Sequence, residues 1–227
     1  MGMRAAISWS GGKDACLAWL LAKDEGFEVS TFLTLCDADG ASKSHALAPA
    51  LLAAQVAAAG GAWREARTAP GSYAQVFDEA LRRLRAESHT HMIFGDIDLQ
   101  AHRDWLEPAC ARAGLAAVFP LWGRSRAEVA RSVIARGIRA RIVCVDTRRL
   151  GAAFCGLDYT PELLERLPAG VCPCGEDGEF HTFVLDAPGF SHPLPVRSGP
   201  QRRVASTPPL APTELVFQTL ILEGGER

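Results

Sequence analysis

The stretch Ile7-Ser8-Trp9-Ser10-Gly11-Gly12-Lys13-Asp14-Ala15 decides the fold of this chain. Apolar residues over 4–9 predict a short buried strand, and a helical pattern over 15–25 follows the glycine pair at once. A glycine turn between a strand and a helix leaves backbone N–H groups free, and the helix dipole adds positive potential at the same point. The segment Ser10-Gly11-Gly12-Lys13-Asp14 therefore predicts a phosphate-binding loop suited to ATP.

Two side chains of this loop fit phosphate chemistry. Lys13 can neutralise developing pyrophosphate charge, and Asp14 can hold magnesium or cap the helix. From the glycines alone, a plain turn with a helix cap would be the better interpretation, but the strand-loop-helix context favours nucleotide binding. A Walker loop would need a glycine where Ile7 stands, and no G-x-G-x-x-G segment is present.

Strand-like and helix-like segments alternate through the first half of the chain. Ser72 and Gln75 predict a capping box at the start of one of the helices. The alternation predicts an α/β fold with a parallel sheet, helices on both faces, and ligands beyond the carboxyl ends of the strands, where Gly11 and Gly95 both lie. The strands are expected at 4–9, 27–35, 62–66, 91–94 and 116–119, and the helices at 15–25, 46–59, from Ser72, and at 101–113.

A boundary near Gly123 divides the chain into a nucleotide domain, 1–123, and a smaller α+β domain, 124–227. Ser125 and Glu128 form a second capping-box pattern just after this boundary, and the regular alternation ends there. The smaller domain is expected to contain strands at 140–145, 180–185 and 215–222, a short helix opened by Thr160-Pro161, and a largely irregular stretch at 188–212.

A second cluster of chemically active residues is Gly175-Glu176-Asp177-Gly178-Glu179-Phe180-His181-Thr182. It contains three carboxylates, an imidazole and a hydroxyl just before an apolar strand. At strand spacing Glu179 and His181 share one face, so they could bind magnesium, an amine or ammonia. The residues alone fit a solvated, charged turn leading into a strand at least as well.

Both clusters resemble motifs of known families. Ser10-Gly11-Gly12-Lys13-Asp14 resembles the PP-loop of the adenine nucleotide alpha hydrolase superfamily, whose members split ATP between the alpha and beta phosphates. The G-E-x-G-E-F-H-T pattern resembles the signature of the diphthine-ammonia ligase (diphthamide synthase-like) family within that superfamily. Four weaker features agree with this resemblance: Ser44-His45, Gly95-Asp96-Ile97, Pro120-Leu121-Trp122 and Asp186-Ala187-Pro188-Gly189-Phe190.

The resemblance implies an AMP-forming amide ligase with ATP and Mg²⁺ as cofactors and with ammonia and a carboxylate as substrates. It implies a PP-loop domain followed by a smaller domain that carries the signature, with the pocket between them. In this scheme the loop from Ser10 to Asp14, with His45 and Gly95, holds the nucleotide, and Asp14 holds the metal. Asp96 contacts magnesium or substrate, and the residues expected to hold the acceptor or to handle the proton of ammonia are Glu176, Glu179 and His181.

Two departures from the family pattern bear on activity. Ala15 stands where the family usually has Ser or Thr, so one hydroxyl contact to phosphate is missing. Archaeal and eukaryotic members have a segment rich in tyrosine and arginine after Gly-Asp-Ile, whereas this chain reads Asp98-Leu99-Gln100-Ala101-His102-Arg103-Asp104-Trp105. That segment falls where the acceptor would be recognised, so the acceptor is left open between diphthine and another carboxylate.

Composition narrows the classes of function. The chain has 24 basic and 26 acidic residues, a formal charge of -2, so no overall positive field attracts nucleic acid. It has no secretory signal and no apolar run long enough for a bilayer, which predicts a cytoplasmic protein without membrane contact. The seven cysteines are then expected to be reduced thiols, and Cys172-Pro173-Cys174 lacks the spacing typical of a zinc site.

Two other functions stay open, as does association into a homo-oligomer. A PP-loop enzyme that modifies tRNA would use the arginine-rich region between Arg124 and Arg149, although no aromatic residues are interleaved there and such runs are usually solvated helix faces. A nucleotide-binding sensor without turnover would fit the alanine at position 15. The sensor would bind ATP and release no pyrophosphate.

Overall fold

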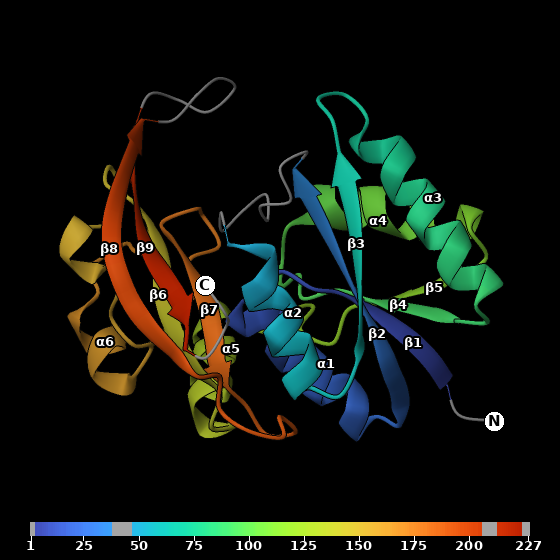
Figure 1. The fold of residues 1–227 in the computed structure, drawn as a ribbon, viewed down its shortest axis with the longest axis horizontal. Helices are drawn as coiled ribbons and strands as arrows, with labels where there is room; N and C mark the ends of the chain where they lie inside the picture. The colour runs from blue at the N-terminus through green and yellow to red at the C-terminus, as the bar shows by residue number, and fades with distance from the viewer. Residues whose placement is uncertain (1–2, 38–46, 206–212, 224–227) are drawn as a thin grey trace.

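A computed structural model describes residues 3–37, 47–205 and 213–223 (Figure 1). Its first half contains a five-stranded sheet in the order β3-β2-β1-β4-β5, in which every neighbouring pair is parallel. The expected α/β class is confirmed. The strands are β1 (Met3–Ser8), β2 (Phe27–Asp37), β3 (Ala62–Thr68), β4 (His91–Ile93) and β5 (Ala116–Val118).

Helices cover both faces of the parallel sheet. On one face, α1 (Lys13–Asp24) and α2 (Pro49–Ala58) pack through their apolar residues into the larger core, which also includes the second sheet. On the other face, α3 (Tyr73–Ala86) and α4 (Gln100–Arg112) enclose a smaller core built around Phe77, Leu81 and Met92. Strands β1 and β4 are neighbours, but the helices that follow them, α1 and α4, lie on opposite faces of the sheet. The carboxyl ends of two such strands form the crevice in which α/β sheets bind ligands.

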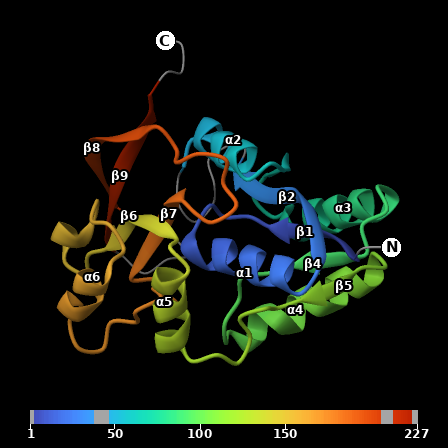
Figure 2. The ribbon, with the colours of Figure 1, turned by 90° about the horizontal axis from the view of Figure 1, so that it is seen from below.

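The second half forms a four-stranded antiparallel sheet in the order β7-β6-β9-β8, seen beside the parallel sheet in Figure 1. Its strands are β6 (Arg139–Asp146), β7 (Phe180–Asp186), β8 (Val196–Ala205) and β9 (Glu214–Leu222). Helix α5 (Arg126–Ala135) contacts α1, and Figure 2 shows the two side by side. A short 3-10 helix, η1 (Ala152–Phe154), and α6 (Pro161–Arg166) complete the elements.

Local signals set several of these elements. The capping box at Ser125 and Glu128 is confirmed, with both reciprocal hydrogen bonds present. Thr160 caps α6 by accepting from the backbone N–H of Leu163, as the Thr160-Pro161 pair predicts. The capping box expected at Ser72 is wrong, because the Ser72 hydroxyl bonds the backbone of Ala69 and leaves the first turn of α3 without a side-chain cap.

The stretch at 188–212 was expected to be largely irregular, and this is wrong for β8. That strand pairs with β9 along one side and is almost entirely exposed, so it shows no alternation of apolar and polar side chains. Its register shifts between Ser198 and Gln201, around Pro200, which lacks a backbone N–H for the ladder. Exposure and the proline together hide an edge strand from pattern analysis.

The two sheets share one hydrophobic core, to which α1, β6, β7 and β9 all contribute. Gly123 lies between β5 and α5, and the division into domains 1–123 and 124–227 stays a prediction. Across the described ranges, no helix has the length and apolarity that a membrane span requires.

Candidate active site

The phosphate loop lies between the end of β1 and the start of α1. Gly11 has a φ of +80°, and a Cβ atom there would lie 2.8 Å from Leu52 Cδ2 and 3.0 Å from Gln55 Oε1, so both conformation and space require glycine. Gly12 is the N-cap of α1 in an extended conformation, and its N–H donates to the Ser10 hydroxyl at 3.3 Å. The loop therefore presents the N-terminus of a twelve-residue helix, the arrangement that favours an anion.

The second sheet holds this loop in place. The backbone N–H of Val184 in β7 donates to the carbonyl oxygen of Gly11 at 2.9 Å, and the Thr182 hydroxyl accepts from the backbone N–H of Lys13 at 3.2 Å. Strand β7 belongs to the signature segment, so the two motifs separated by about two thirds of the chain are joined directly. The pairing between them fixes the loop against a rigid strand.

Gln55 is the central link between these parts, and sequence reasoning did not identify it. Its side chain is fully buried, and its Nε2 donates to the carbonyl oxygens of Gly11 at 3.1 Å and Val184 at 2.7 Å. Its Oε1 accepts from Trp9 Nε1 at 2.8 Å. The available signal was one polar residue within the apolar pattern of α2.

Lys13 is buried beneath the loop and keeps its charge. Its Nζ donates to Asp14 Oδ2 at 2.7 Å and to the carbonyl oxygen of Cys174 at 2.5 Å, and it lies 5.5 Å from the ring centre of Tyr159. Burial acts to lower the pKa of Lys13, but the negative charge of Asp14 and its hydrogen bond outweigh burial and raise that pKa. The ammonium group thus supplies fixed positive charge at the base of the phosphate site.

Asp14 has one carboxylate oxygen engaged and one available. Oδ2 accepts from Lys13, whereas Oδ1 is buried and has no hydrogen-bond partner among the described residues. Magnesium in nucleotide sites is commonly held by one or two carboxylates together with phosphate oxygens, so Asp14 Oδ1 fits such an ion. No group of three or more metal-ligating side chains occurs in the described part of the chain, so a metal here would take its other ligands largely from the nucleotide and from water.

A cavity of about 310 Å³ opens beside the loop and collects most of the expected site residues. Gly11 and Glu179 do not line it, and His45 lies outside the described residues. Its lining comes from three parts of the chain, the end of β1 with the phosphate loop, the segment after β4 with the start of α4, and the signature segment: Ser8, Ser10, Gly12, Lys13, Asp14, Ala15, Gly95, Asp96, Leu99, His102, Glu176, Phe180, His181 and Thr182.

Gly95 allows the segment after β4 to approach the phosphate loop. A Cβ atom at this position would lie 2.9 Å from the backbone nitrogen of Ala15, too close for any side chain. Asp96 follows at the rim of the cavity, where its Oδ1 and His102 Nδ1 are 2.8 Å apart. The close packing at Gly95 thus sets the position of Asp96 relative to the phosphate loop.

Glu176 and His181 bring two proton-exchanging groups to the lining of the same cavity. Burial, with the nearby charge of Asp14, raises the pKa of Glu176 to about 8. Burial, with the nearby charge of Lys13, lowers the pKa of His181 to about 4. At neutral pH the Glu176 carboxyl is therefore mostly protonated and the His181 imidazole is neutral, so both can exchange protons with a ligand.

Glu179 has a different position from the one that strand spacing suggested. It is 3% exposed and precedes β7, and its two oxygens accept from the backbone N–H groups of Cys172 at 2.8 Å and Asp177 at 3.1 Å. These bonds close the turn that carries Glu176. The structure therefore brings Glu176 and His181 into the cavity and leaves Glu179 behind them, beneath the turn.

Comparison with known families matches two profiles in order along the chain. The diphthamide synthase N-terminal domain matches residues 3–117, and the diphthamide synthase C-terminal domain matches residues 125–205. The chain belongs to the diphthamide synthase family. The resemblance inferred from the two motifs is thereby confirmed.

Curated relatives of this diphthamide synthase family member carry the name diphthine–ammonia ligase. The protein from Danio rerio is 28% identical over 216 residues, which covers 83% of this chain and 84% of the relative. The protein from Mus musculus is 28% identical over 225 residues, covering 86% and 84% of the two chains. The protein from Homo sapiens is 33% identical over 100 residues, or 41% of this chain and 37% of the relative. These matches support a family of ATP-dependent amide ligases.

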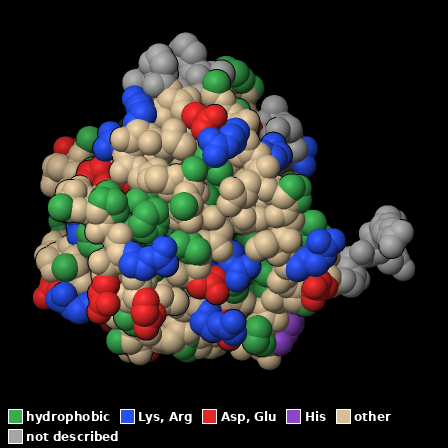
Figure 3. Space-filling view, turned by 90° about the vertical axis from the view of Figure 1, so that its left-hand side faces the viewer, with side chains coloured by type: hydrophobic (Ala, Val, Ile, Leu, Met, Phe, Trp, Pro, Cys, Tyr) green, Lys and Arg blue, Asp and Glu red, His purple; other side chains and the backbone are tan. Residues whose placement is uncertain are grey.

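In this diphthamide synthase family member, the cysteines that were weighed as a metal site are buried, and most of the arginines that were weighed as an RNA-binding region lie in ion pairs. All seven cysteines are buried. Arg126 bridges Asp98 at 2.7 Å and Asp177 at 2.8 Å, which ties the segment before α4 to the signature turn. Arg136, Arg139, Arg141, Arg148 and Arg149 each lie in an ion pair with a carboxylate. On the face seen in Figure 3, basic and acidic side chains are likewise mixed rather than gathered by sign.

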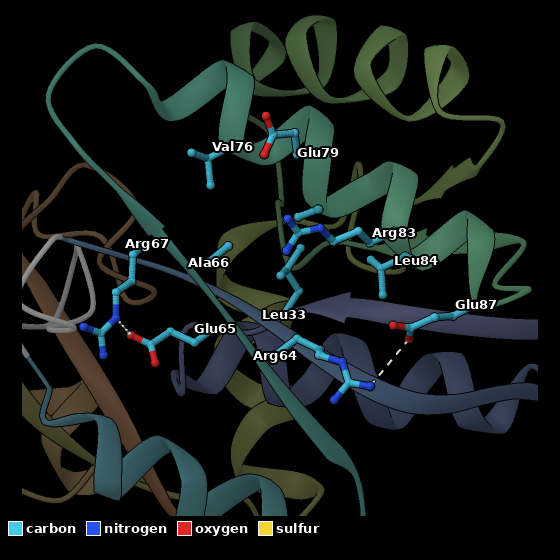
Figure 4. Close-up of a pocket in the computed structure, with 11 residues that line it drawn as sticks. Leu33, Arg64, Glu65, Ala66, Arg67, Val76, Glu79, Arg83, Leu84 and Glu87 are labelled. Atoms are coloured by element: carbon cyan, nitrogen blue, oxygen red, sulfur yellow. Dashed lines mark hydrogen bonds and ion pairs between the residues drawn. The ribbon is translucent and has the colours of Figure 1, made fainter.

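A further cavity of about 350 Å³ lies between β3 and α3 in this family member (Figure 4). Charged side chains of both signs line it, and two pairs of them are joined: Arg67 Nε to Glu65 Oε1 at 2.6 Å and Arg64 Nη2 to Glu87 Oε2 at 3.7 Å. It contains no residue of the phosphate loop or of the signature segment. We therefore assign the candidate active site to the cavity beside the loop.

Proposed function

We propose that this protein is an AMP-forming ligase that uses ATP to join ammonia to a carboxylate acceptor. The observation that carries the proposal is the single cavity in which a phosphate loop, Asp96, Glu176 and His181 meet. A loop at a helix N-terminus suits the anionic nucleotide, and two groups with shifted pKa values suit proton transfer. The relatives named diphthine–ammonia ligase support the same chemistry.

The reaction has two steps. In the first, a carboxylate oxygen of the acceptor attacks the alpha phosphorus of ATP, the bond to the bridging oxygen breaks, and pyrophosphate leaves. In the second, the nitrogen of ammonia attacks the acyl carbon, AMP leaves, and one proton passes from nitrogen to a base. Ser10 to Asp14 would hold the phosphates, with Lys13 countering their charge. His45 and Gly95 would contact the nucleotide.

The residues around the cavity divide the remaining work. Asp14 Oδ1 would bind Mg²⁺, which supplies charge neutralisation at the phosphates when bound. Asp96 would contact the metal or the acceptor at the rim. Either the ionised form of Glu176 or the neutral His181 imidazole would take the one proton that the attacking nitrogen loses. Glu179 would act through Glu176, because it holds the turn on which Glu176 lies.

The test is release of pyrophosphate and AMP from ATP with magnesium and ammonium, measured across pools of carboxylate metabolites and with a diphthine-bearing protein as one acceptor. Asp14→Ala serves as the blank, and Asp24→Ala, exposed at the other end of the same helix, is the matched control. We expect AMP formation that depends on both a pool and ammonium, and that Asp14→Ala abolishes.

Two outcomes would contradict the proposal. ATP binding without AMP from any acceptor would favour a nucleotide sensor. AMP formation that requires tRNA, together with RNA binding that weakens with salt, would favour a tRNA-modifying enzyme.

A further inference from the structure

A third cavity, of about 500 Å³, adjoins the candidate active site. It lies between the first turns of α3 and α4, beyond the carboxyl ends of β1 and β4. Four aromatic rings from α3, α4 and the end of β4 form most of its wall: its lining is Ser8, Tyr73, Phe77, Phe94, Asp96, Ala101, His102, Trp105 and Leu106. We call this cavity the aromatic chamber.

The aromatic chamber and the phosphate cavity share a border. Ser8, Asp96 and His102 line both, and the hydrogen bond between Asp96 Oδ1 and His102 Nδ1 lies on that border. A molecule with its body in the chamber could therefore extend one end past these residues to the phosphates held by residues 10–14.

The chamber is suited to a flat body that carries no negative charge. Phe77 and Trp105 stack with ring centres 5.1 Å apart, and Tyr73 lies 5.6 Å from Trp105. Tyr73 is 40% exposed and Trp105 is 38% exposed, among the few large hydrophobic side chains with that exposure in the described residues. Aromatic faces left open inside a cavity favour stacking with a planar ligand.

Charge in the chamber is confined to its border with the active site. Asp96 and His102 are the ionisable side chains there apart from the Tyr73 phenol, and no Lys or Arg lines the chamber. A ligand whose body carries a second negative charge would thus meet a carboxylate and no cation. The polar groups that could hydrogen-bond to the edge of adenine also lie at this border and not inside the chamber. The chamber therefore suits the body of the acceptor better than it suits adenine.

We propose that the aromatic chamber holds the body of the acceptor, and that the acceptor is a carboxylate carrying a flat aromatic group. This inference rests on the proposed ligase function, since it is that reaction which requires a carboxylate to reach the alpha phosphate. The carboxylate would pass Asp96 and His102, and the aromatic group would stack on Trp105 and Tyr73.

The experiment uses the full chain and two ligand series. The aromatic probes are 3-phenylpropionate and indole-3-acetate, and the compact probes are acetate and succinate. Binding of each is measured by ligand-observed NMR with an ATP analogue that cannot be cleaved between the alpha and beta phosphates, and turnover by ammonium-dependent AMP release. Trp105→Leu removes the stacking face, while Phe154→Leu, in η1, is the matched aromatic control that lines neither cavity. Calorimetry gives the Kd for ATP in each variant.

We expect the aromatic probes to bind and the compact probes not to. Trp105→Leu should weaken that binding, or raise KM for the acceptor, about tenfold, with an unchanged Kd for ATP. Phe154→Leu should change neither. The inference would be overturned if the aromatic probes did not bind, or if Trp105→Leu left their binding unchanged. It would also be overturned if Trp105→Leu weakened ATP binding instead, because the chamber would then hold adenine. Aromatic probes that bind through Trp105 while no acceptor yields AMP would retain the chamber as a binding site and count against the ligase reaction.

Discussion

The Nζ of Lys13 donates a hydrogen bond of 2.5 Å to the carbonyl oxygen of Cys174, a residue 161 positions further along the chain. This bond joins the residue of the phosphate loop that carries positive charge to the turn that leads into Glu176. The Lys13 side chain is only 2% exposed, so this hydrogen bond is buried. The loop and the signature segment are therefore held together at one site.

Gln55→Leu should lower the free energy of unfolding by about 2 to 4 kcal/mol, because Trp9 Nε1 and two carbonyl oxygens would lose a buried partner. ATP binding should weaken in the same variant, since Gly11 carries one of those carbonyls. Urea denaturation and calorimetry measure the two effects. Gln75→Leu, an exposed glutamine bonded only to Glu79 on its own helix, is the control and should change neither. A stable Gln55→Leu variant with full ATP affinity would show that the link is dispensable.

Gly95→Ala should both destabilise the protein and reduce ATP binding. The new Cβ would lie 2.9 Å from the backbone of Ala15, and relief of that clash must move either β4 or the phosphate loop, at a cost of about 1 to 3 kcal/mol. Gly151→Ala is a matched control, because no atom lies within 4 Å of the added Cβ and its φ is -58°. Thermal unfolding and ATP titration of the pair would separate the clash from the loss of a glycine. Equal behaviour of the two variants would contradict the close packing.

Glu176→Gln should change how AMP formation depends on pH. Because the pKa of Glu176 is raised to about 8, its carboxyl group becomes ionised, and so able to accept a proton, only as the pH rises through that value. With free ammonia held constant, the rate of the parent should rise through this range, and the rate of Glu176→Gln should be lower and lack the rise. Glu165→Gln, an exposed site in α6, should behave as the parent does. A Glu176→Gln profile that follows the parent would remove Glu176 from proton transfer.

Asp146→Asn should destabilise the second sheet at neutral pH but not in acid. Burial opposes ionisation of Asp146, yet hydrogen bonds from Arg148 and Thr213 outweigh it and lower the pKa to about 2. A lowered carboxyl pKa contributes stability that is present above the unfolded value of about 4 and is lost as the pH falls through the folded value. The parent should therefore exceed Asp146→Asn by roughly 2 kcal/mol at pH near 7, with the difference closing between about pH 4 and pH 2. Urea midpoints across this range measure it, and a difference that persists in acid would contradict the assignment.

Much of the fold followed from local patterns. The parallel sheet and most of the helices could be predicted because buried strands and amphipathic helices have distinct periodicities. The capping box at Ser125 could also be predicted, because its two partners lie only three residues apart. The pattern at Ser72 failed because the serine hydroxyl found a nearer backbone partner at Ala69, and β8 was missed because an exposed edge strand needs no apolar face.

The sequence by itself predicted the loop at residues 10–14, the family and the order of most of the elements, because each depends on residues close together in the chain. Only the tertiary structure decided which residues face the cavity. It turned Glu176 and His181 inward, used Glu179 to close the turn, and made Gln55 the link between two sheets. It also opened the aromatic chamber between α3 and α4. These relationships join residues far apart in sequence, and they are set by packing and by the need of buried polar groups for partners, which no local pattern records.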